Sequence, residues 1–113
     1  MKIILNNSSQ ASTTFSLPGT GQGVLTVYGT SYCTAQDVLG TVEIYFDNQK
    51  IGTMESWSNT PYQHRMMCPF IAPVTLDNDA GNNHSIEFKA GPNTVIDHND
   101  RFTATLQFKA TVD

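Results

Sequence analysis

Three histidines and their acidic neighbours are the residues of this chain most able to do chemistry. His64, His84 and His98 each lie near an acid or an amide in the sequence. A histidine between a serine and a carboxylate forms a hydrolytic triad, which is defined in space and not in sequence. However, the chain has no Gly-x-Ser-x-Gly elbow to display a serine. Cys68 follows His64 by four residues, which on one strand separates them by about 13 Å, too far to react. We predict that the protein is not an enzyme.

Two runs of acidic and amide side chains resemble cation sites. One contains Asp97, Asn99 and Asp100, and the other spans residues 77–79. Calcium takes six to eight oxygen ligands, commonly from such loops, but neither run has the glycine and glutamate of an EF-hand. The alternative is that these side chains hydrogen-bond the backbone of their own turns. We favour that interpretation, with Asp97, Asp100 and Arg101 as a structural turn, and expect no metal and no cofactor.

An aromatic and polar loop is the main candidate for ligand binding. Trp57 and Tyr62 lie among Ser, Asn, Thr and Pro residues, and His64 and Arg65 follow them. Aromatic rings with polar neighbours suit contact with sugars, and protein interfaces use the same side chains. We take these four residues as the candidate binding site; the alternative is that Trp57 is a core residue. Further candidates for exposed aromatic residues are Tyr28, Tyr32 and Tyr45.

The only two arginines, Arg65 and Arg101, have a predicted structural role. We expect a charge-assisted hydrogen bond from one of them to Asp97 or Asp100. Such a bond would hold the last loop against the strand that begins at His64.

Strands separated by turn residues must position all these groups, because no segment is long enough for more than a short helical turn. The last strand has the clearest pattern. Phe102, Ala104 and Leu106 alternate with Thr103, Thr105 and Gln107. This alternation buries one face and exposes the other, as in an antiparallel sheet with one solvated face. The predicted strands are residues 2–5, 13–17, 24–33, 40–47, 50–57, 64–76, 84–90, 94–96 and 101–112.

Turn residues predict three local features. Asp47-Asn48-Gln49 is typical of a hairpin tip, because Asp and Asn tolerate a positive φ. Gly29 predicts a bulge or bend. Pro69 and Pro73 predict that the strand over residues 64–76 lies at an edge, is bulged, or is split in two.

The fold class that follows is all-β: a single antiparallel β-sandwich, jelly-roll-like, with about eight strands. An immunoglobulin-like sandwich is the alternative. We divide the chain into an N-terminal arm or first strand over residues 1–12 and a β-sandwich domain over residues 13–113. In the first part, Lys2, Ile3, Ile4 and Leu5 form a candidate assembly arm that adds a strand to a neighbour, or else a strand that pairs within its own domain.

Composition and charge exclude several classes of protein. The chain has 113 residues, enough for one domain, with a formal net charge of −4 and no basic run, so we expect no nucleic-acid partner. No apolar run is long enough to span a membrane or to act as a signal peptide, so we expect synthesis in a cytoplasm. That compartment favours reduced thiols, and we expect Cys33 and Cys68 to be buried and unpaired, with a disulfide as the alternative.

The order of several short motifs resembles small β-sandwich modules of bacteriophage virion proteins. In these modules an x-Asp-Gly-x-x-x-Gly hairpin is followed by an Asn-Glu-x-x-Ser-His-Lys-like loop. A Gly-x-His-x-Ile strand and a final Asp-x-Asn-Asp-x-Phe segment come after. The present chain departs from the pattern where Asn48-Gln49 replaces the hairpin glycine and where residues 60–63 replace the usual Glu and Ser. The matching segments are residues 25–29, 42–48, 51–53, 59–65, 80–86 and 94–102.

The resemblance implies a virion surface protein made in the host cytoplasm. Because the chain starts at its own methionine and has no fibre shaft, we expect a capsid decoration (cement) protein, a homotrimer bound to the major capsid protein or to other virion proteins. The alternative is a receptor- or glycan-binding module of a phage tail fibre, with a host surface glycan as partner.

Overall fold

The computed structural model describes residues 2–6, 10–16, 20–76 and 83–108, which form ten strands. None of the described residues belongs to a helix that could cross a membrane. The expected all-β class is confirmed. The strands are β1 (Lys2–Asn6), β2 (Gln10–Ser16), β3 (Gly21–Cys33), β4 (Val38–Phe46), β5 (Gln49–Ser58), β6 (Arg65–Met66), β7 (Phe70–Leu76), β8 (Asn83–Ala90), β9 (Thr94–Val95) and β10 (Arg101–Phe108).

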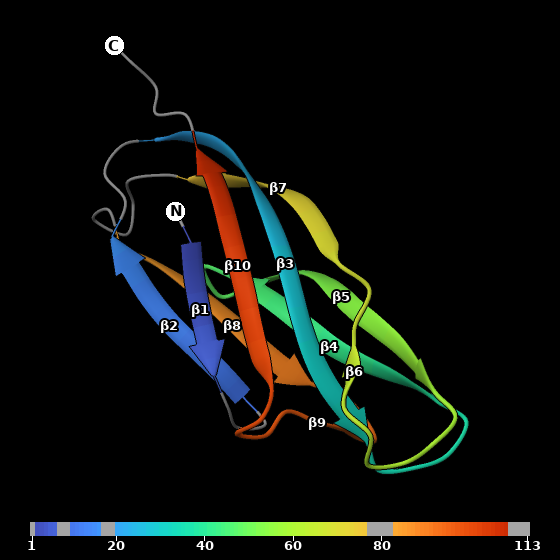
Figure 1. The fold of residues 1–113 in the computed structure, drawn as a ribbon. Helices are drawn as coiled ribbons and strands as arrows, with labels where there is room; N and C mark the ends of the chain where they lie inside the picture. The colour runs from blue at the N-terminus through green and yellow to red at the C-terminus, as the bar shows by residue number, and fades with distance from the viewer. Residues whose placement is uncertain (1, 7–9, 17–19, 77–82, 109–113) are drawn as a thin grey trace.

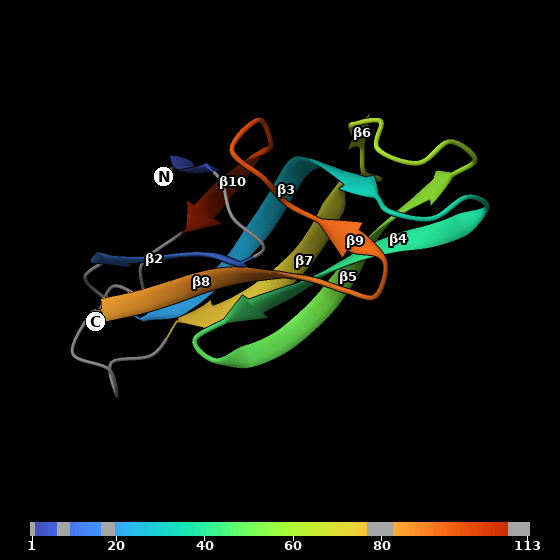
Figure 2. The ribbon, with the colours of Figure 1, turned by 90° about the horizontal axis from the view of Figure 1, so that it is seen from below.

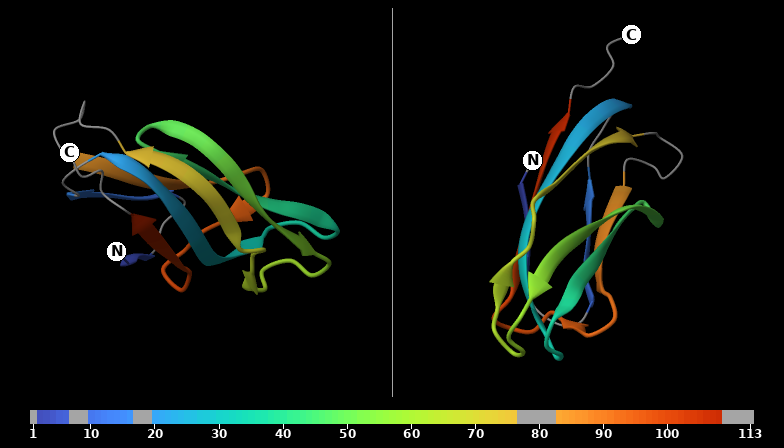
Figure 3. Two further views of the ribbon diagram at one scale, coloured as in Figure 1. Left: turned by 90° about the horizontal axis from the view of Figure 1, so that it is seen from above. Right: turned by 90° about the vertical axis from the view of Figure 1, so that its right-hand side faces the viewer.

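Two antiparallel sheets lie face to face (Figures 1 and 3). In the first sheet β10 lies between β1 and β3, and β3 also pairs with β6, β7 and β9. The second sheet has the order β2-β8-β4-β5. Along the chain the strands pass repeatedly from one sheet to the other, so neighbours in a sheet are often distant in sequence. This arrangement is the predicted jelly-roll-like sandwich.

The core lies between the inner faces of the two sheets. In β10, Phe102, Ala104 and Leu106 are buried, and Thr103, Thr105 and Gln107 lie on the outer face, as the alternation predicts. The Phe102 ring stacks on Phe88 of the second sheet, with centroids 4.6 Å apart. Val27, Val42, Ile44 and Ile86 are fully buried in the same cluster. Residues 109–112 of the predicted last strand lie outside the described residues.

Gly29 leaves space for the ring of Phe102, and it does not form a bulge. Its register with β10 is continuous, and Gly29 stands opposite Phe102. A Cβ at this position would lie 2.2 Å from the Phe102 ring. The predicted bulge is therefore wrong, because the glycine is needed by a side chain on the neighbouring strand.

The segment with Pro69 and Pro73 is split in two, one of the three predicted outcomes. β6 ends at Met66, and β7 begins at Phe70. Both strands pair with β3, at different points along it. Pro73 lies in β7 opposite Val24, and the missing N–H is tolerated because β7 has no second ladder partner among the described strands.

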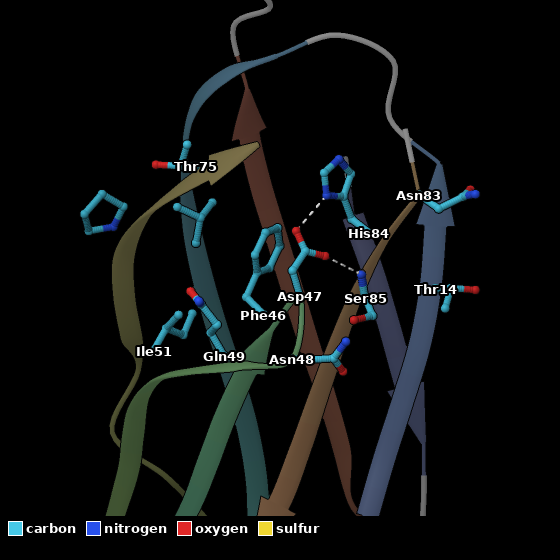
Figure 4. Close-up of a pocket in the computed structure, with 12 residues that line it drawn as sticks. Thr14, Phe46, Asp47, Asn48, Gln49, Ile51, Thr75, Asn83, His84 and Ser85 are labelled. Atoms are coloured by element: carbon cyan, nitrogen blue, oxygen red, sulfur yellow. Dashed lines mark hydrogen bonds and ion pairs between the residues drawn. The ribbon is translucent and has the colours of Figure 1, made fainter. Parts of the chain in front are cut away.

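The β4–β5 hairpin tip is confirmed where the sequence predicts it. Asp47 and Asn48 both have a positive φ, at 49° and 65°. Two consecutive residues with a positive φ are typical of two-residue hairpin turns, because the twist of such a turn matches the twist of the two strands. The turn directs Asp47 and Gln49 toward the open end of the sandwich (Figure 4).

The candidate assembly arm is an edge strand of its own chain. β1 pairs with β10 over Lys2↔Thr105 to Asn6↔Arg101, and β2 then joins the second sheet. The structure thus shows the alternative in which residues 2–5 pair within the domain. The first sheet supplies the template, because β10 offers an unpaired edge on that side.

The two cysteines are unpaired, as expected, but they differ in burial. Cys33 is buried on the inner face of β3, whereas Cys68 is exposed. The predicted burial of Cys68 is wrong, because it lies in the short connection between β6 and β7 and not in a strand.

Candidate functional site

Two loops meet beside the end of β3 and form the candidate site. One connects β5 to β6, and the other connects β9 to β10; Figure 2 shows both on the same side of the molecule. The first is attached through the Tyr62 N–H, which donates to the Cys33 carbonyl at 2.7 Å. The second loop begins directly after Val95, which pairs with Tyr32 of β3, and its Asp100 Oδ1 accepts a hydrogen bond from the Thr30 hydroxyl at 2.8 Å. The end of β3 thus supports both loops.

Tyr62, Tyr32 and His64 form a small aromatic cluster in this site. The Tyr32 ring lies 6.1 Å from Tyr62 and 5.0 Å from His64, the latter edge to face. Tyr62 is 66% exposed and has a φ of 63°. A positive φ is unusual for a bulky residue, and such strain is concentrated at functional positions. The fold therefore holds the Tyr62 backbone in an unfavourable conformation and leaves the ring exposed beside Tyr32.

A buried carboxylate ties the two loops together. Asp100 is fully buried. Its Oδ1 lies 2.7 Å from His64 Nδ1 and accepts a hydrogen bond from the Thr30 hydroxyl at 2.8 Å. Its Oδ2 accepts a bond from the Asp97 N–H at 2.9 Å. Each carboxylate oxygen has a partner, as a buried acid requires.

The interpretation of residues 97–100 as a structural turn is confirmed. The Asn99 N–H donates to Asp97 Oδ1 at 2.8 Å, and the Asp100 N–H donates to the Asp97 carbonyl at 3.0 Å. Side-chain and backbone oxygens of Asp97 therefore close the turn, as Asx residues commonly do. The outer nitrogen of His64, Nε2, lies 3.6 Å from Asp97 Oδ2.

His64, and not an arginine, holds the last loop. No ion pair joins Arg65 or Arg101 to Asp97 or Asp100 within the described ranges. Arg65 instead donates from Nη2 to Asn59 Oδ1 at 3.0 Å and to Gln63 Oε1 at 3.3 Å. The prediction of an arginine contact is wrong because Arg65 turns toward its own loop.

One group of residues in the site has the spacing of cation ligands. Donor atoms of His64, Asp97 and Asp100 lie within 4.8 Å of one another. Asp100, however, already uses both oxygens on the three donors described above. A cation would have to displace the 2.7 Å contact of Asp100 with His64. The arrangement acts as a hydrogen-bonded brace that sets the positions of the His64 and Tyr62 loop.

Trp57 lies outside this site. It is 61% exposed on the outer face of β5, opposite Leu39 of β4, which is 46% exposed. Tyr62 and Arg65 instead lie at the end of the first sheet. The Tyr62 N–H donates to the Cys33 carbonyl, and Arg65 pairs with Ser31 of β3. The alternative in which Trp57 is a core residue is also wrong. Of the four candidate binding residues, the structure brings together Tyr62, His64 and Arg65.

A second polar cluster, which the sequence did not point to, lies at the opposite end of the second sheet. There His84 Nδ1 lies 2.8 Å from Asp47 Oδ2 at the hairpin tip (Figure 4). The two residues are 37 positions apart in sequence, and no local pattern joins them. The third histidine, His98, is exposed in the β9–β10 loop. Among the described residues, none of the three histidines contacts another histidine.

Comparisons by sequence identify no relatives: no family model matches the chain, and no curated protein matches it significantly. Comparisons by structure show the fold. A family 35 carbohydrate-binding module from Clostridium thermocellum has a TM-score of 0.50 at 12% identity, covering 91% of this chain and 90% of that one. The sugar-binding EclA C-terminal domain has a TM-score of 0.52 at 9% identity, with 95% and 77% covered. Eiger TNF from S. frugiperda has a TM-score of 0.58 at 10% identity, with 100% and 95% covered.

These similarities establish a class of fold and nothing narrower. The chain is a small jelly-roll β-sandwich module of the kind found in carbohydrate-binding modules. At these identities a shared fold does not carry a shared function. The expected β-sandwich module is confirmed, and these structures lend no support to the phage part of the resemblance.

Proposed function

We propose that the protein is a glycan-binding module whose ligand contacts Tyr62. The observation that carries the proposal is the exposed Tyr62 ring, which lies beside Tyr32 on a backbone bonded to Cys33. An exposed aromatic ring offers apolar area at a small cost in conformational entropy on binding. The apolar face of a sugar ring is a suitable partner for such a surface.

Polar side chains next to Tyr62 supply hydrogen bonds of the kind that sugar hydroxyls need. Asn59, Gln63 and Arg65 form a connected group through the Arg65 guanidinium. The Arg65 Nε is buried and has no hydrogen-bond partner among the described residues. A ring bordered by amide and guanidinium groups resembles the general composition of small-ligand sites, which combine apolar area with a few placed polar groups. The sugar-binding descriptions of two fold neighbours are consistent with this proposal.

The test compares variants at Tyr62 with a variant at Trp57. Tyr62→Asn removes the ring and keeps a residue type that tolerates a positive φ. Affinity gel electrophoresis against a panel of soluble polysaccharides identifies a ligand, and calorimetry then measures its Kd. We expect Tyr62→Asn to weaken binding about tenfold, equivalent to about 1.4 kcal/mol. Tyr62→Phe should retain most of the affinity, because the ring remains.

Trp57→Ala is the matched control, because it removes an aromatic ring of similar exposure from the other sheet. We expect its Kd to equal that of the unmodified protein. If no polysaccharide in the panel retards the protein, or if Trp57→Ala weakens binding and Tyr62→Asn does not, the proposal is wrong.

A second candidate function is assembly on a virion as a capsid decoration protein, which acts by binding and not by catalysis. The observation that favours it is the absence of charged residues from β3 and β7 of the first sheet. Val24, Tyr28, Met66 and Ile71 are exposed on this sheet, at 41%, 47%, 69% and 67%. An exposed apolar patch of this kind commonly marks a protein interface. Its test is an oligomer measurement, described in the Discussion.

A further inference from the structure

The open end of the sandwich contains a cavity of about 650 Å³ that the Tyr62 site does not use. It lies beside the β4–β5 hairpin tip, between β7 and β8 (Figure 4). The ten residues of β5 separate it from the loop of Tyr62, a distance of roughly 30 Å along an extended strand. Its volume falls within the range of about 300–1,000 Å³ that is typical of small-ligand sites.

Asp47 forms a fixed polar wall of this cavity. Its N–H donates to the Ser85 carbonyl at 2.9 Å, and its Oδ1 accepts a bond from the Ser85 N–H at 2.9 Å. Its Oδ2 lies 2.8 Å from His84 Nδ1. The hairpin is thus bonded to β8 at three points, and the carboxylate is held in place. About a third of the Asp47 side chain remains exposed, so its oxygens keep room for a further donor.

His84 holds the Asp47 carboxylate from inside the sandwich. Its side chain is fully buried and packs with the rings of Phe15 and Phe46, which also contact each other. The Asp47 contact uses Nδ1, and Nε2 has no partner among the described residues. With Asp47 accepting the proton of Nδ1, Nε2 of a neutral ring is an acceptor. Because Nε2 is itself buried, His84 positions the Asp47 carboxylate and does not contact a ligand in the cavity.

The remaining lining residues define the chemistry of a ligand. Figure 4 shows Phe46, Asp47 and Gln49 directed toward the space between β7 and β8. Ile51 and Val74 add apolar surface, and Gln49 adds an amide. None of the described lining residues is a lysine or an arginine. The site therefore lacks a counter-charge for an anion, and it combines hydrogen-bonding groups with an apolar wall.

We propose that this cavity is a second binding site, which takes one neutral, hydroxyl-rich unit such as a monosaccharide. Hydroxyl groups of the unit donate to the exposed part of the Asp47 carboxylate, and Gln49 bonds a further hydroxyl. The C–H surface of the unit lies against Ile51 and Val74. The site is independent of the Tyr62 surface and does not depend on the function proposed for it.

The experiment is an NMR titration of the full chain with a panel of neutral hexoses, pentoses and N-acetylhexosamines. We expect at least one of them to give saturable shifts of the Asp47, Gln49 and Ser85 amides. Gln49→Trp fills the cavity from an exposed position and should abolish these shifts. Lys50→Trp is the matched control on the adjacent residue, and it should leave them unchanged.

Gln49→Ala is a second variant, needed because the larger side chain of Gln49→Trp could itself disturb folding. It removes the amide and should weaken the binding at least threefold. Tyr62→Asn should leave the shifts at the cavity unchanged, so loss of the Tyr62 function and loss of this site are distinguishable. If none of the sugars gives saturable shifts at these residues, or if Gln49→Trp leaves the shifts in place, the proposed site is wrong.

Discussion

Contacts between single side chains hold the loops at one end of the sandwich and the hairpin at the other. His64 and His84 are each paired with an aspartate that is distant in the sequence. His64 lies against the buried Asp100, 36 residues away, and His84 lies against Asp47. The sequence identified the histidines and acids as the reactive residues. It could not assign partners, because each pair forms only when strands from distant parts of the chain come together.

Tyr45 and Glu43 provide a prediction at this scale. They share the outer face of β4, and the Tyr45 hydroxyl donates to Glu43 Oε2 at 2.7 Å. This hydrogen bond, with a smaller contribution from the Lys50 charge, lowers the pKa of Glu43 below its usual 4.5. The same bond raises the pKa of Tyr45 above its usual 10.0, because ionisation of Tyr45 would remove the donor.

The sign of the pH dependence follows from these two directions. The stabilisation by Glu43 is present above its unfolded pKa and is lost as pH falls through the lower folded pKa. The stabilisation by Tyr45 is present below its unfolded pKa and is lost as pH rises through the higher folded pKa. We expect the ultraviolet titration of Tyr45→Phe to lack one tyrosine with a midpoint above 10.0. A difference curve with its midpoint at or below that value would contradict the prediction.

At the scale of elements, β3 organises the first sheet and both loops of the Tyr62 site. It pairs with β10 and β9, and also with β7 and β6. The alternation of apolar and polar residues was sufficient to predict β10, and the turn residues were sufficient to predict the β4–β5 hairpin. The role of Gly29 was not predictable, since it depends on Phe102 of a strand that is far away in sequence.

The brace between the β5–β6 and β9–β10 loops gives a prediction for these elements. Asp100→Ala leaves the Asp97 N–H and the Thr30 hydroxyl without their acceptor and removes the partner of His64. We expect a loss of about 3 kcal/mol in the free energy of unfolding, because one partner of a buried charged network is removed. Urea denaturation measures this difference.

His98→Ala is the control for that measurement. His98 is exposed in the same loop, so we expect a change within about 0.5 kcal/mol. If Asp100→Ala is as stable as His98→Ala, the buried carboxylate is not the brace described here.

At the scale of the whole molecule, the two outer faces differ in charge. The second sheet carries Glu43, Lys50, Glu87 and Lys89 on its outer face, whereas β3 and β7 of the first sheet carry no charge. Val24, Tyr28, Met66 and Ile71 are exposed on the first sheet, and Leu39 and Trp57 are exposed on the second. The proposed virion assembly would use the face of the first sheet, and the proposed glycan site lies at its end.

An assembly surface on β3 and β7 predicts a trimer in solution. Sedimentation velocity should then show a trimer for the unmodified protein, and Ile71→Lys should convert it to a monomer, because a charge would be buried without a partner. Leu39→Lys places the same charge at an exposed apolar position of the other sheet and should leave the trimer intact. A monomer at all concentrations would contradict assembly through this face.

The sequence alone determined the all-β class, the alternation of β10, the hairpin tip at Asp47-Asn48, and the structural turn at residues 97–100. These features depend on local geometry: a period of two along a strand and residue types that tolerate a positive φ. Only the tertiary structure decided which sheet each strand joins, that Trp57 and Tyr62 belong to different surfaces, and that His84 meets Asp47. Those results depend on contacts between distant segments, which form when two sheets bury their apolar faces against each other.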